Sequence, residues 1–322
     1  MSLTGSPPKD SGRLARGVHG ARPLGPAREF GPLLLLALIW GGSVPLTKLG
    51  LREIPPLTLT ALRYVVAAPC FVWLLRGRPL PPPRSLAAAA GLGVLGIAVG
   101  QLSQTLGVGR TSASVATVIS ATIPILVVVF ARIRLRQAIA LRQGLGFAVA
   151  LGGVALVATG DPRHLMPLLT SRALGGEALV LFSAVTIALY YVMSVELVGR
   201  YSVITIAAVT SLAGTLALIP VAAWELRHAA LRLTGEGVAV VGYLALLVTV
   251  VGLLIWFRAL HRLPASAAAA LQYLQPIVGV GASAALFGDP LGTWFGVGTG
   301  LVFLGIALST TGQPAGATSP SS

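Results

Sequence analysis

Charged residues are scarce in this chain of 322 residues, and the scarcity excludes the commonest classes of protein. Only 10% of the residues are charged, against about 25% in soluble globular domains. Apolar residues make up 55% of the chain. That is too much to hide beneath a charged surface and too much for a disordered chain. The composition indicates a protein that crosses a membrane several times.

Residues for catalysis and metal binding are also scarce. The single cysteine, Cys70, excludes a disulfide framework and any zinc or iron–sulfur site that needs several cysteines. The four histidines fall in tails or in connections between apolar segments, and no Gly-x-Ser-x-Gly, His-Glu-x-x-His or Gly-Lys-Ser/Thr string occurs. We therefore expect neither an enzyme nor a metal or cofactor site.

Ten apolar segments have the ~20 residues that a membrane helix needs. They cover residues 31–51, 57–75, 86–106, 112–131, 139–159, 175–196, 203–223, 236–257, 265–287 and 291–311. The connections are too short for a soluble domain. The sequence thus predicts an all-α membrane protein with ten transmembrane helices, and disordered tails at 1–29 and 312–322 because both are rich in small and polar residues or proline.

The distribution of basic residues predicts the orientation. The 23 Lys and Arg residues outnumber the 9 acidic ones and give a net charge of +14. Fifteen lie in the first tail and in alternate loops, six in the opposite loops, and two, Lys48 and Arg63, inside predicted spans. Cytoplasmic loops carry the excess of Lys and Arg. We expect a cytoplasmic-membrane protein with both termini inside and no nucleic-acid partner.

The two halves of the sequence match each other at a shift of 152 residues. Ser114 and Pro124 align with Ser266 and Pro276, and several glycines align at the same shift. Each half holds five spans, an odd number, so the second half enters the membrane from the opposite side. Inverted repeats around a midplane site are typical of transporters that work by alternating access. We expect one repeat over 30–160, a loop over 161–174 and a second repeat over 175–311.

Four segments, in order along the chain, carry a further pattern. They read WGGSVPLTKLGL at 40–51, PLTLTALRYVVAA at 56–68, RTSASVATVISATIPIL at 110–126 and WFRALHRLPASAAAALQYLQPIV at 256–278. Together they resemble the EamA-type drug/metabolite transporters. The resemblance implies ten helices in two inverted halves and export of a small organic solute, and amino-acid exporters belong to this superfamily. The chain departs from the family pattern at Arg136-Gln137 and Gly288-Asp289, where the family often has Gly-Glu.

Charge inside a predicted span costs ~2.5–3.5 kcal/mol on insertion scales and marks a candidate site. Lys48 lies near the end of its span, from which its side chain can reach the interface. Arg63 lies deeper, where it either holds an anionic group of a substrate or pairs with backbone carbonyls. A nucleotide-sugar or sugar phosphate would need several deep basic residues, so a zwitterionic or weakly charged metabolite fits better.

Prolines and amides predict a polar cavity at the middle of both halves. Pro124 and Pro276 each remove a helix hydrogen bond and kink the helix, and the freed carbonyls need polar partners. Amides recur three residues apart on one helix face, where interhelical hydrogen bonding is the competing explanation. The candidate substrate-binding residues at this depth are Trp40, Arg63, Gln101, Gln104, Ser120, Tyr190, Gln272 and Gln275.

Tryptophan and small residues support further predictions. Trp40 and Tyr190 lie deep in their spans, where they either stack on a substrate or pack; Trp73, Trp224 and Trp256 lie near span ends and predict interfacial anchors. Two stripes of small residues predict close helix contacts. These stripes are Ala140, Gly144, Ala148 and Gly152, and Gly292, Gly296 and Gly300. Because such a contact can form within one chain or between two chains, the stripes do not distinguish a monomer from a homodimer.

The sequence as a whole predicts a secondary transporter that exports small amphipathic metabolites, with amino acids as the leading class, by rocking of the inverted halves. The alternatives are a nucleotide-sugar or sugar-phosphate transporter of the same superfamily and a membrane scaffold that transports nothing. The expected partners are a small-molecule substrate and the lipid bilayer.

Overall fold

The computed structural model describes residues 27–111, 113–136, 140–159, 161, 163, 174–263, 265–287 and 292–310, which are almost entirely helical. Most of both predicted tails, most of the loop at 161–174, and Gln137, Gly288 and Asp289 lie outside the described residues. Within the described part, seven helical segments are long and apolar enough to cross a membrane.

Five helical segments form the first half. They are α1–α2 (Ala27–Gly41 and Ser43–Gly50), α3 (Pro56–Leu75), α4–η2–α5 (Pro83–Gly93, Val94–Gln101 and Leu102–Arg110), α6–α7 (Ala113–Ser120 and Ile123–Leu135) and α8 (Leu141–Thr159). All of them are rich in Leu, Ala, Val and Gly, so most side chains can face lipid or a neighbouring helix without a polar partner.

The second half repeats this order. Its segments are α10 (Leu174–Val198), α11 (Val203–Glu225), α12–η4–α13 (Gly235–Gly242, Tyr243–Val251 and Gly252–Arg262), α14–α15 (Ala265–Gln272 and Leu274–Phe287) and α16 (Thr293–Thr310). Because each half has an odd number of segments, the second half is inverted relative to the first. The predicted all-α fold of ten helices in two inverted repeats is confirmed.

Capping residues determine where several helices begin. Pro56 and Pro83 occupy first-turn positions of α3 and α4, where the missing amide hydrogen costs nothing. Ser202 and Thr234 are extended residues that precede α11 and α12, and their hydroxyls accept hydrogen bonds from amides of the first turn.

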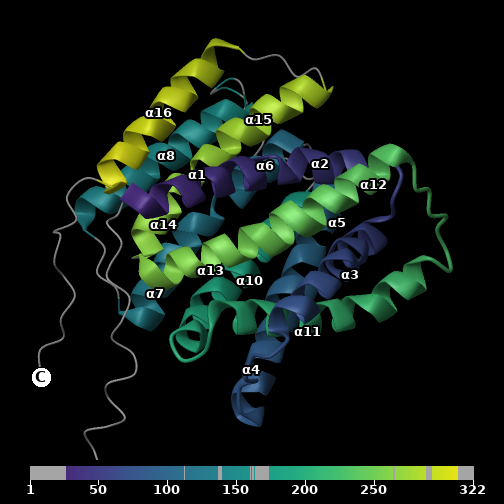
Figure 1. The fold of residues 1–322 in the computed structure, drawn as a ribbon. Coiled ribbons are helices and arrows are strands. Elements are labelled where there is room, and N and C mark those ends of the chain that lie inside the picture. The colour runs from purple at the N-terminus through teal and green to yellow at the C-terminus, as the bar shows by residue number, and fades with distance from the viewer. Residues whose placement is uncertain are drawn as a thin grey trace, which may run out of the picture.

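The halves pack through equivalent helices. Helix α16 lies along α8 at one end of the bundle, and α11 lies along α3 at the other (Figure 1). The third segment of each half packs on the first segment of the other: η2 and α5 on α10, and α13 and η4 on α1. This exchange places the first and third segments of both halves around a common centre.

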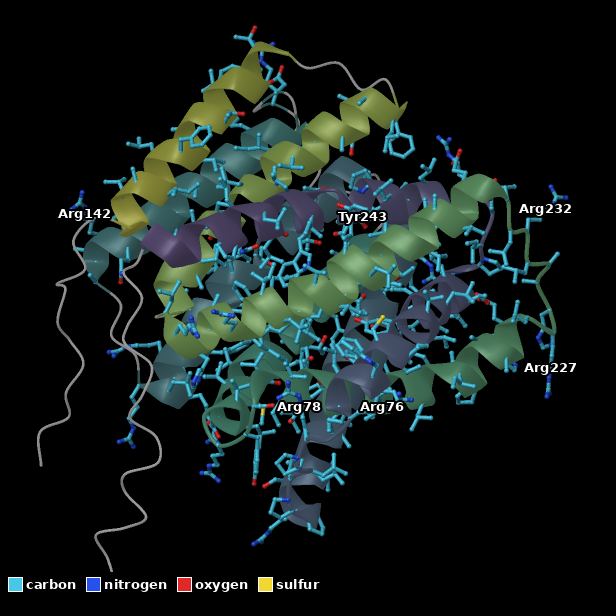
Figure 2. All side chains as sticks on the ribbon, viewed as in Figure 1. Arg76, Arg78, Arg142, Arg227, Arg232 and Tyr243 are labelled. Carbon is cyan, nitrogen blue, oxygen red and sulfur yellow. The ribbon has the colours of Figure 1, made fainter. Side chains whose placement is uncertain are left out.

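Basic side chains lie at both ends of the bundle. Figure 2 shows Arg142 at one edge, and Arg227 and Arg232 at the opposite edge. The sequence assigns the first to one set of loops and the other two to the opposite set. Their separation in space agrees with spans that run from one edge to the other.

Glycines of the repeat bring α8 and α16 into backbone contact. A Cβ placed on Gly153 would lie 2.5 Å from the Gly298 carbonyl oxygen, and one on Gly305 would lie 2.5 Å from the Gly146 carbonyl oxygen. Gly146 and Gly298 are equivalent under the shift of 152 residues, and so are Gly153 and Gly305. The contact is therefore symmetric between the halves.

The two predicted stripes of small residues point away from this contact. Ala140, Gly144, Ala148, Gly152, Gly292, Gly296 and Gly300 are all exposed. A Cβ on any of the five glycines among them would meet no atom within 4 Å. The prediction that the stripes mark a helix contact is wrong for contacts within this chain. Each residue turns the helix by ~100°, so the adjacent row, which contains Gly153, meets the partner helix instead.

The fourth and ninth segments are interrupted just before the repeated prolines. Helix α6 ends at Ser120 and α7 begins one residue before Pro124. Helix α14 ends at Gln272 and α15 begins two residues before Pro276. Proline lacks the amide hydrogen and clashes with the preceding turn, so each helix restarts there. The two interruptions are equivalent in the repeat.

The third segment of each half contains a π-helical stretch, η2 in the first half and η4 in the second. A π-helical turn is wider than an α-helical one and is frequently found at functional sites. Both stretches occupy the middle of their segments, which is the level of the interrupted helices.

Candidate functional site

A cavity of about 100 Å³ lies between the two halves. Its walls come from the first, third, fourth, sixth, eighth and ninth segments, with α3 adding Arg63 and Tyr64. All ten residues proposed from the sequence as binding or kink residues line it: Trp40, Arg63, Gln101, Gln104, Ser120, Pro124, Tyr190, Gln272, Gln275 and Pro276. The structure thus brings them together, while their part in binding stays a prediction.

Arg63 is held in the cavity wall by neutral partners from both halves. Its Nε donates to the Thr249 hydroxyl at 2.6 Å, and one terminal nitrogen donates to the Gln101 side-chain oxygen at 3.1 Å. Its guanidinium carbon also lies 5.3 Å from the centre of the Tyr64 ring. The Thr249 hydroxyl in turn donates to the Leu244 carbonyl oxygen. These contacts fix the direction of the guanidinium without neutralising its charge.

Two amide pairs flank the interrupted helices. The Gln104 side-chain nitrogen donates to the Ser120 hydroxyl at 3.3 Å, at the end of α6. The Gln275 side-chain nitrogen donates to the Gln272 side-chain oxygen across the break between α14 and α15. Gln272 is almost completely buried, and its own side-chain nitrogen has no hydrogen-bond partner. Buried amides without partners are costly, so this donor is available to an acceptor inside the cavity.

An aromatic cluster covers another wall. The rings of Trp40 and Tyr191 stack with centroids 6.0 Å apart, and the Trp256 ring lies 5.7 Å from Trp40 and 5.5 Å from Tyr191. The Trp40 indole nitrogen donates to the Val248 carbonyl oxygen at 3.0 Å. The indole nitrogen of Trp40 is therefore bound within the protein, while the Trp40 side chain also lines the cavity.

Trp256 corrects one prediction from the sequence. The sequence predicts an anchor at the membrane interface, but Trp256 is 1% exposed and lines the cavity. The segment α12–η4–α13 extends to Arg262, so Trp256 is nearly two turns from its end. Trp73 and Trp224 are 67% and 60% exposed, as expected of side chains at the bundle surface.

Tyr191 and Thr249 are lining residues that the sequence reasoning missed. Thr249 belongs to η4, and a single threonine in an apolar span gives no signal by itself. In the sequence, Tyr191 is distinguished only by its place deep in an apolar span beside Tyr190. The Tyr190 hydroxyl already has a partner in the structure, because it lies 3.0 Å from the Thr210 hydroxyl.

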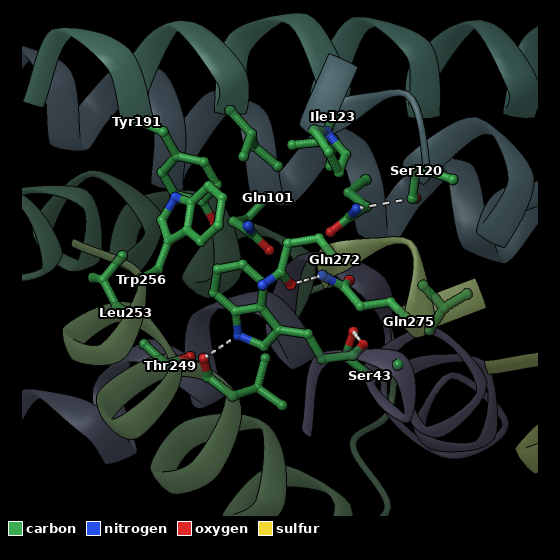
Figure 3. A pocket seen from close by; sticks show the side chains of 18 of the residues that line it. Ser43, Gln101, Ser120, Ile123, Tyr191, Thr249, Leu253, Trp256, Gln272 and Gln275 are labelled. Carbon is green, nitrogen blue, oxygen red and sulfur yellow. Dashed lines mark hydrogen bonds between the residues drawn. The ribbon is translucent and has the colours of Figure 1, made fainter. Parts of the chain in front are cut away.

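Some lining residues occupy equivalent positions in the two halves but differ in polarity. At the shift of 152 residues, Gln101 is equivalent to Leu253 and Gln104 to Trp256, and all four line the cavity. At these two positions of the third segments, the first half therefore offers amides and the second half offers largely apolar side chains. Figure 3 shows Leu253 and Trp256 together on one side and Ser120 on the other, with Gln101 between them.

Two other charged residues, Lys48 and Glu196, lie outside the cavity lining. Lys48 donates to three carbonyl oxygens at the end of α5, those of Val108, Gly109 and Thr111, at 2.9, 3.3 and 2.7 Å. Glu196 forms an ion pair with Arg134, 2.8 Å between charged atoms, at an exposed edge. The structure gives Lys48 a helix-capping contact, the kind that a cation makes with a helix C-terminus.

Comparison with known proteins places the chain in a family. The EamA-like transporter family matches it twice, over residues 32–159 and 174–311. The chain belongs to the EamA-like transporter family. Both matches coincide with the five-helix halves of the fold, so the EamA assignment and the internal repeat describe the same duplication. The chain is a multi-pass membrane transporter.

Relatives of this EamA chain cover most of its length. An uncharacterised transporter of Archaeoglobus fulgidus is 28% identical over 277 residues, which are 85% of this chain and 95% of that one. The uncharacterised inner membrane transporter YedA of Escherichia coli is 27% identical over 291 residues, 88% and 91% of the two chains. A probable terminal-alkyne amino-acid exporter of Streptantibioticus cattleyicolor is 26% identical over 250 residues, 76% and 81%.

A solved crystal structure shares the fold. It superposes with a TM-score of 0.71 at 16% sequence identity and covers 88% of this chain and 96% of its own. At that identity the likeness concerns the fold alone.

Proposed function

We propose that this protein is a secondary transporter that exports small amphipathic metabolites, with amino acids as the leading class. The observation that carries the proposal is the central cavity, which has one amide-lined wall and one aromatic wall between inverted halves. A substrate with a polar end and an apolar end is complementary to both walls. The similarity to a probable terminal-alkyne amino-acid exporter supports the same class.

The proposed mechanism is alternating access. The halves rock about the cavity, so that the site opens first to one side of the membrane and then to the other. The interrupted helices α6–α7 and α14–α15 border the cavity from both halves and provide the places where a segment can bend. Among the described residues that line the cavity, none is Asp, Glu or His. We therefore propose no proton-binding step there, and the substrate gradient sets the direction.

Transport by the purified full-length protein in liposomes tests the proposal. Liposomes are loaded with unlabelled leucine, and uptake of labelled leucine by exchange is compared with that of protein-free liposomes. A panel of other amino acids and one sugar phosphate then competes for this uptake. We expect protein-dependent leucine exchange that other amphipathic amino acids inhibit and the sugar phosphate does not. If no amino acid moves under any imposed gradient, the proposed function is wrong.

Two substitutions connect this activity to the cavity. Gln275→Leu and Arg63→Ala are expected to lower the exchange rate while the protein is recovered folded in normal yield. Arg232→Gln is the matched control, because it removes a positive charge from an exposed loop residue outside the cavity lining. Normal exchange by both cavity variants would remove these residues from the site.

We further propose that the protein lies in the cytoplasmic membrane with both termini in the cytoplasm, on the strength of the excess of Lys and Arg in one set of loops. A Cys70→Ala background leaves no other cysteine, so Ser319→Cys reports the location of the C-terminus. Labelling by a membrane-impermeant thiol reagent is expected only after the cells are opened. Labelling of Ser319→Cys in intact cells would show that the C-terminus lies outside the cytoplasm and that the proposed orientation is wrong.

A further inference from the structure

Arg63 carries a charge that no described residue neutralises. Two of the five N–H groups of a guanidinium are used here, one by Thr249 and one by Gln101. Both partners are neutral, and no described residue that lines the cavity is Asp or Glu. A cation at membrane depth without an anionic partner is costly in free energy. The cavity therefore favours a ligand that carries a negative charge.

A second donor without an acceptor lies in the same cavity. The Gln272 side chain is 2% exposed, and its amide nitrogen has no hydrogen-bond partner. Figure 3 shows the ends of Gln272 and Gln101 facing each other at the centre of the cavity. Because Gln101 is also a direct partner of Arg63, these two donors lie on either side of one amide. The Trp256 indole nitrogen is a further buried donor in the described lining that has no hydrogen-bond partner.

We propose that the cavity contains a carboxylate subsite in which one carboxylate of the ligand accepts hydrogen bonds from Arg63 and Gln272. The subsite needs no ammonium group on the ligand, because the described lining offers no carboxylate to bind one. The class of ligand is a small monocarboxylate with an apolar body, of which a zwitterionic amino acid is only one member. The inference rests on the proposed function in treating this cavity as the substrate site.

The shape and polarity of the cavity limit the rest of the ligand. A volume of about 100 Å³ is several times what a single water needs, so the cavity has room for a ligand of several heavy atoms such as a branched aliphatic acid. The apolar body would lie against Leu253 and Trp256, the apolar equivalents of Gln101 and Gln104. A phosphate ester is less suited, because only one cationic side chain is present among the described lining residues to meet two negative charges.

Ligand binding to the purified wild-type protein tests the subsite directly. Trp40 and Trp256 line the cavity, so tryptophan fluorescence reports binding. The probes are 4-methylpentanoate, leucine and 3-methylbutylamine at neutral pH, which share a branched apolar body and differ in their charged groups. We expect saturable binding of both carboxylates, with affinities within about threefold of each other because the ammonium meets no Asp or Glu among the described lining residues, and no saturable binding of the amine.

Several results would overturn the subsite. Binding of the amine as tightly as of the carboxylates would show that the cavity reads the apolar body alone. If leucine binds and 4-methylpentanoate does not, the ligand needs its ammonium group and the proposed subsite is wrong. Absence of binding by all three probes would also refute the proposal, because each fits the cavity by size.

Variants identify the residue responsible. Arg63→Gln is expected to lower the affinity for 4-methylpentanoate by roughly 10- to 100-fold, the usual worth of a charged hydrogen bond. Arg63→Lys keeps the charge and should retain the preference for carboxylates over the amine. Arg232→Gln, the surface control, should bind as the wild type does. Unchanged affinity in a folded Arg63→Gln variant contradicts the proposal; if that variant does not fold, the Lys variant and the wild-type probe series decide.

Binding and transport separate this inference from the proposed function. Carboxylate-selective binding without movement of any solute in liposomes would keep the subsite and remove the transporter proposal. Leucine exchange that 3-methylbutylamine inhibits as strongly as 4-methylpentanoate would keep the transporter and remove the subsite.

Discussion

A single methyl group at the contact between α8 and α16 gives a stringent test of the fold. The substitution is Gly153→Ala, and its neighbour Gly152→Ala is the control. A Cβ at Gly153 would lie 2.5 Å from the Gly298 carbonyl oxygen and 2.8 Å from the Val302 amide nitrogen, whereas a Cβ at Gly152 would meet no atom within 4 Å. The two variants differ by one residue in sequence and by ~100° around the helix.

The expected magnitude follows from the distances. Ordinary contacts between heavy atoms lie at ~3.5–4.0 Å, so the helices must separate by roughly 1 Å to admit the methyl group. The colliding atoms are backbone and cannot rotate away, unlike the end of a flexible side chain. Overpacking of this kind costs ~1–3 kcal/mol. Gly152→Ala meets no clash and gains up to ~1 kcal/mol of helix stability.

The assay is unfolding of the purified protein in detergent, followed by helix content as temperature or denaturing detergent rises. We expect the midpoint to fall for Gly153→Ala and to stay level or rise for Gly152→Ala. Gly305→Ala should reproduce the first result, because its Cβ would lie 2.5 Å from the Gly146 carbonyl oxygen. The double variant should lose less than the sum, since one separation of the helices relieves both clashes. Equal midpoints for the two single variants at 152 and 153 would refute the symmetric glycine contact.

Three further substitutions test contacts around and outside the cavity. Lys48→Met should destabilise the protein by ~1–3 kcal/mol, because three carbonyl oxygens, including that of Thr111, lose their donor; an unchanged unfolding midpoint would return Lys48 to a free interfacial side chain. Glu225→Gln should cost ~1–2 kcal/mol in the same assay, since the buried carboxylate accepts from the amide and hydroxyl of Thr58 at the start of α3. Trp40→Ala should shift the substrate preference away from large apolar side chains, measured by competition in liposomes, and an unaltered competition profile would limit Trp40 to packing.

The membrane fold could be predicted from sequence because long apolar runs are a strong signal. A span of ~20 apolar residues has few alternatives in a bilayer, and an odd number of spans per repeat dictates inversion. The restarts before Pro124 and Pro276 follow from the chemistry of one residue type. Helix ends were less accurate: the third segment begins at Pro83 and ends at Arg110, beyond the expected 86–106 at both ends.

Other features depend on packing that no local pattern encodes. The π-helical stretch η4 presents the Val248 carbonyl to Trp40 and the Thr249 hydroxyl to Arg63, and nothing in its run of apolar residues distinguishes it from an α-helix. The glycine stripe at spacing four predicts the wrong face, because Gly152 and Gly153 are indistinguishable by residue type. The prediction for Trp256 is wrong because its distance from the helix end depends on a boundary set by tertiary structure.

The repeat explains why the candidate site could be found at all. Where the halves keep the same residue, as at Pro124 and Pro276 or at Gly153 and Gly305, that residue builds the scaffold that both halves need. Where equivalent lining positions differ, as Gln101 differs from Leu253, the difference creates polarity across the cavity. A perfectly symmetric lining would offer a substrate two identical walls and no preferred direction of binding. We therefore expect identical residues in the repeat to build the scaffold, and residues that differ between the halves at cavity depth to be the candidates for substrate recognition.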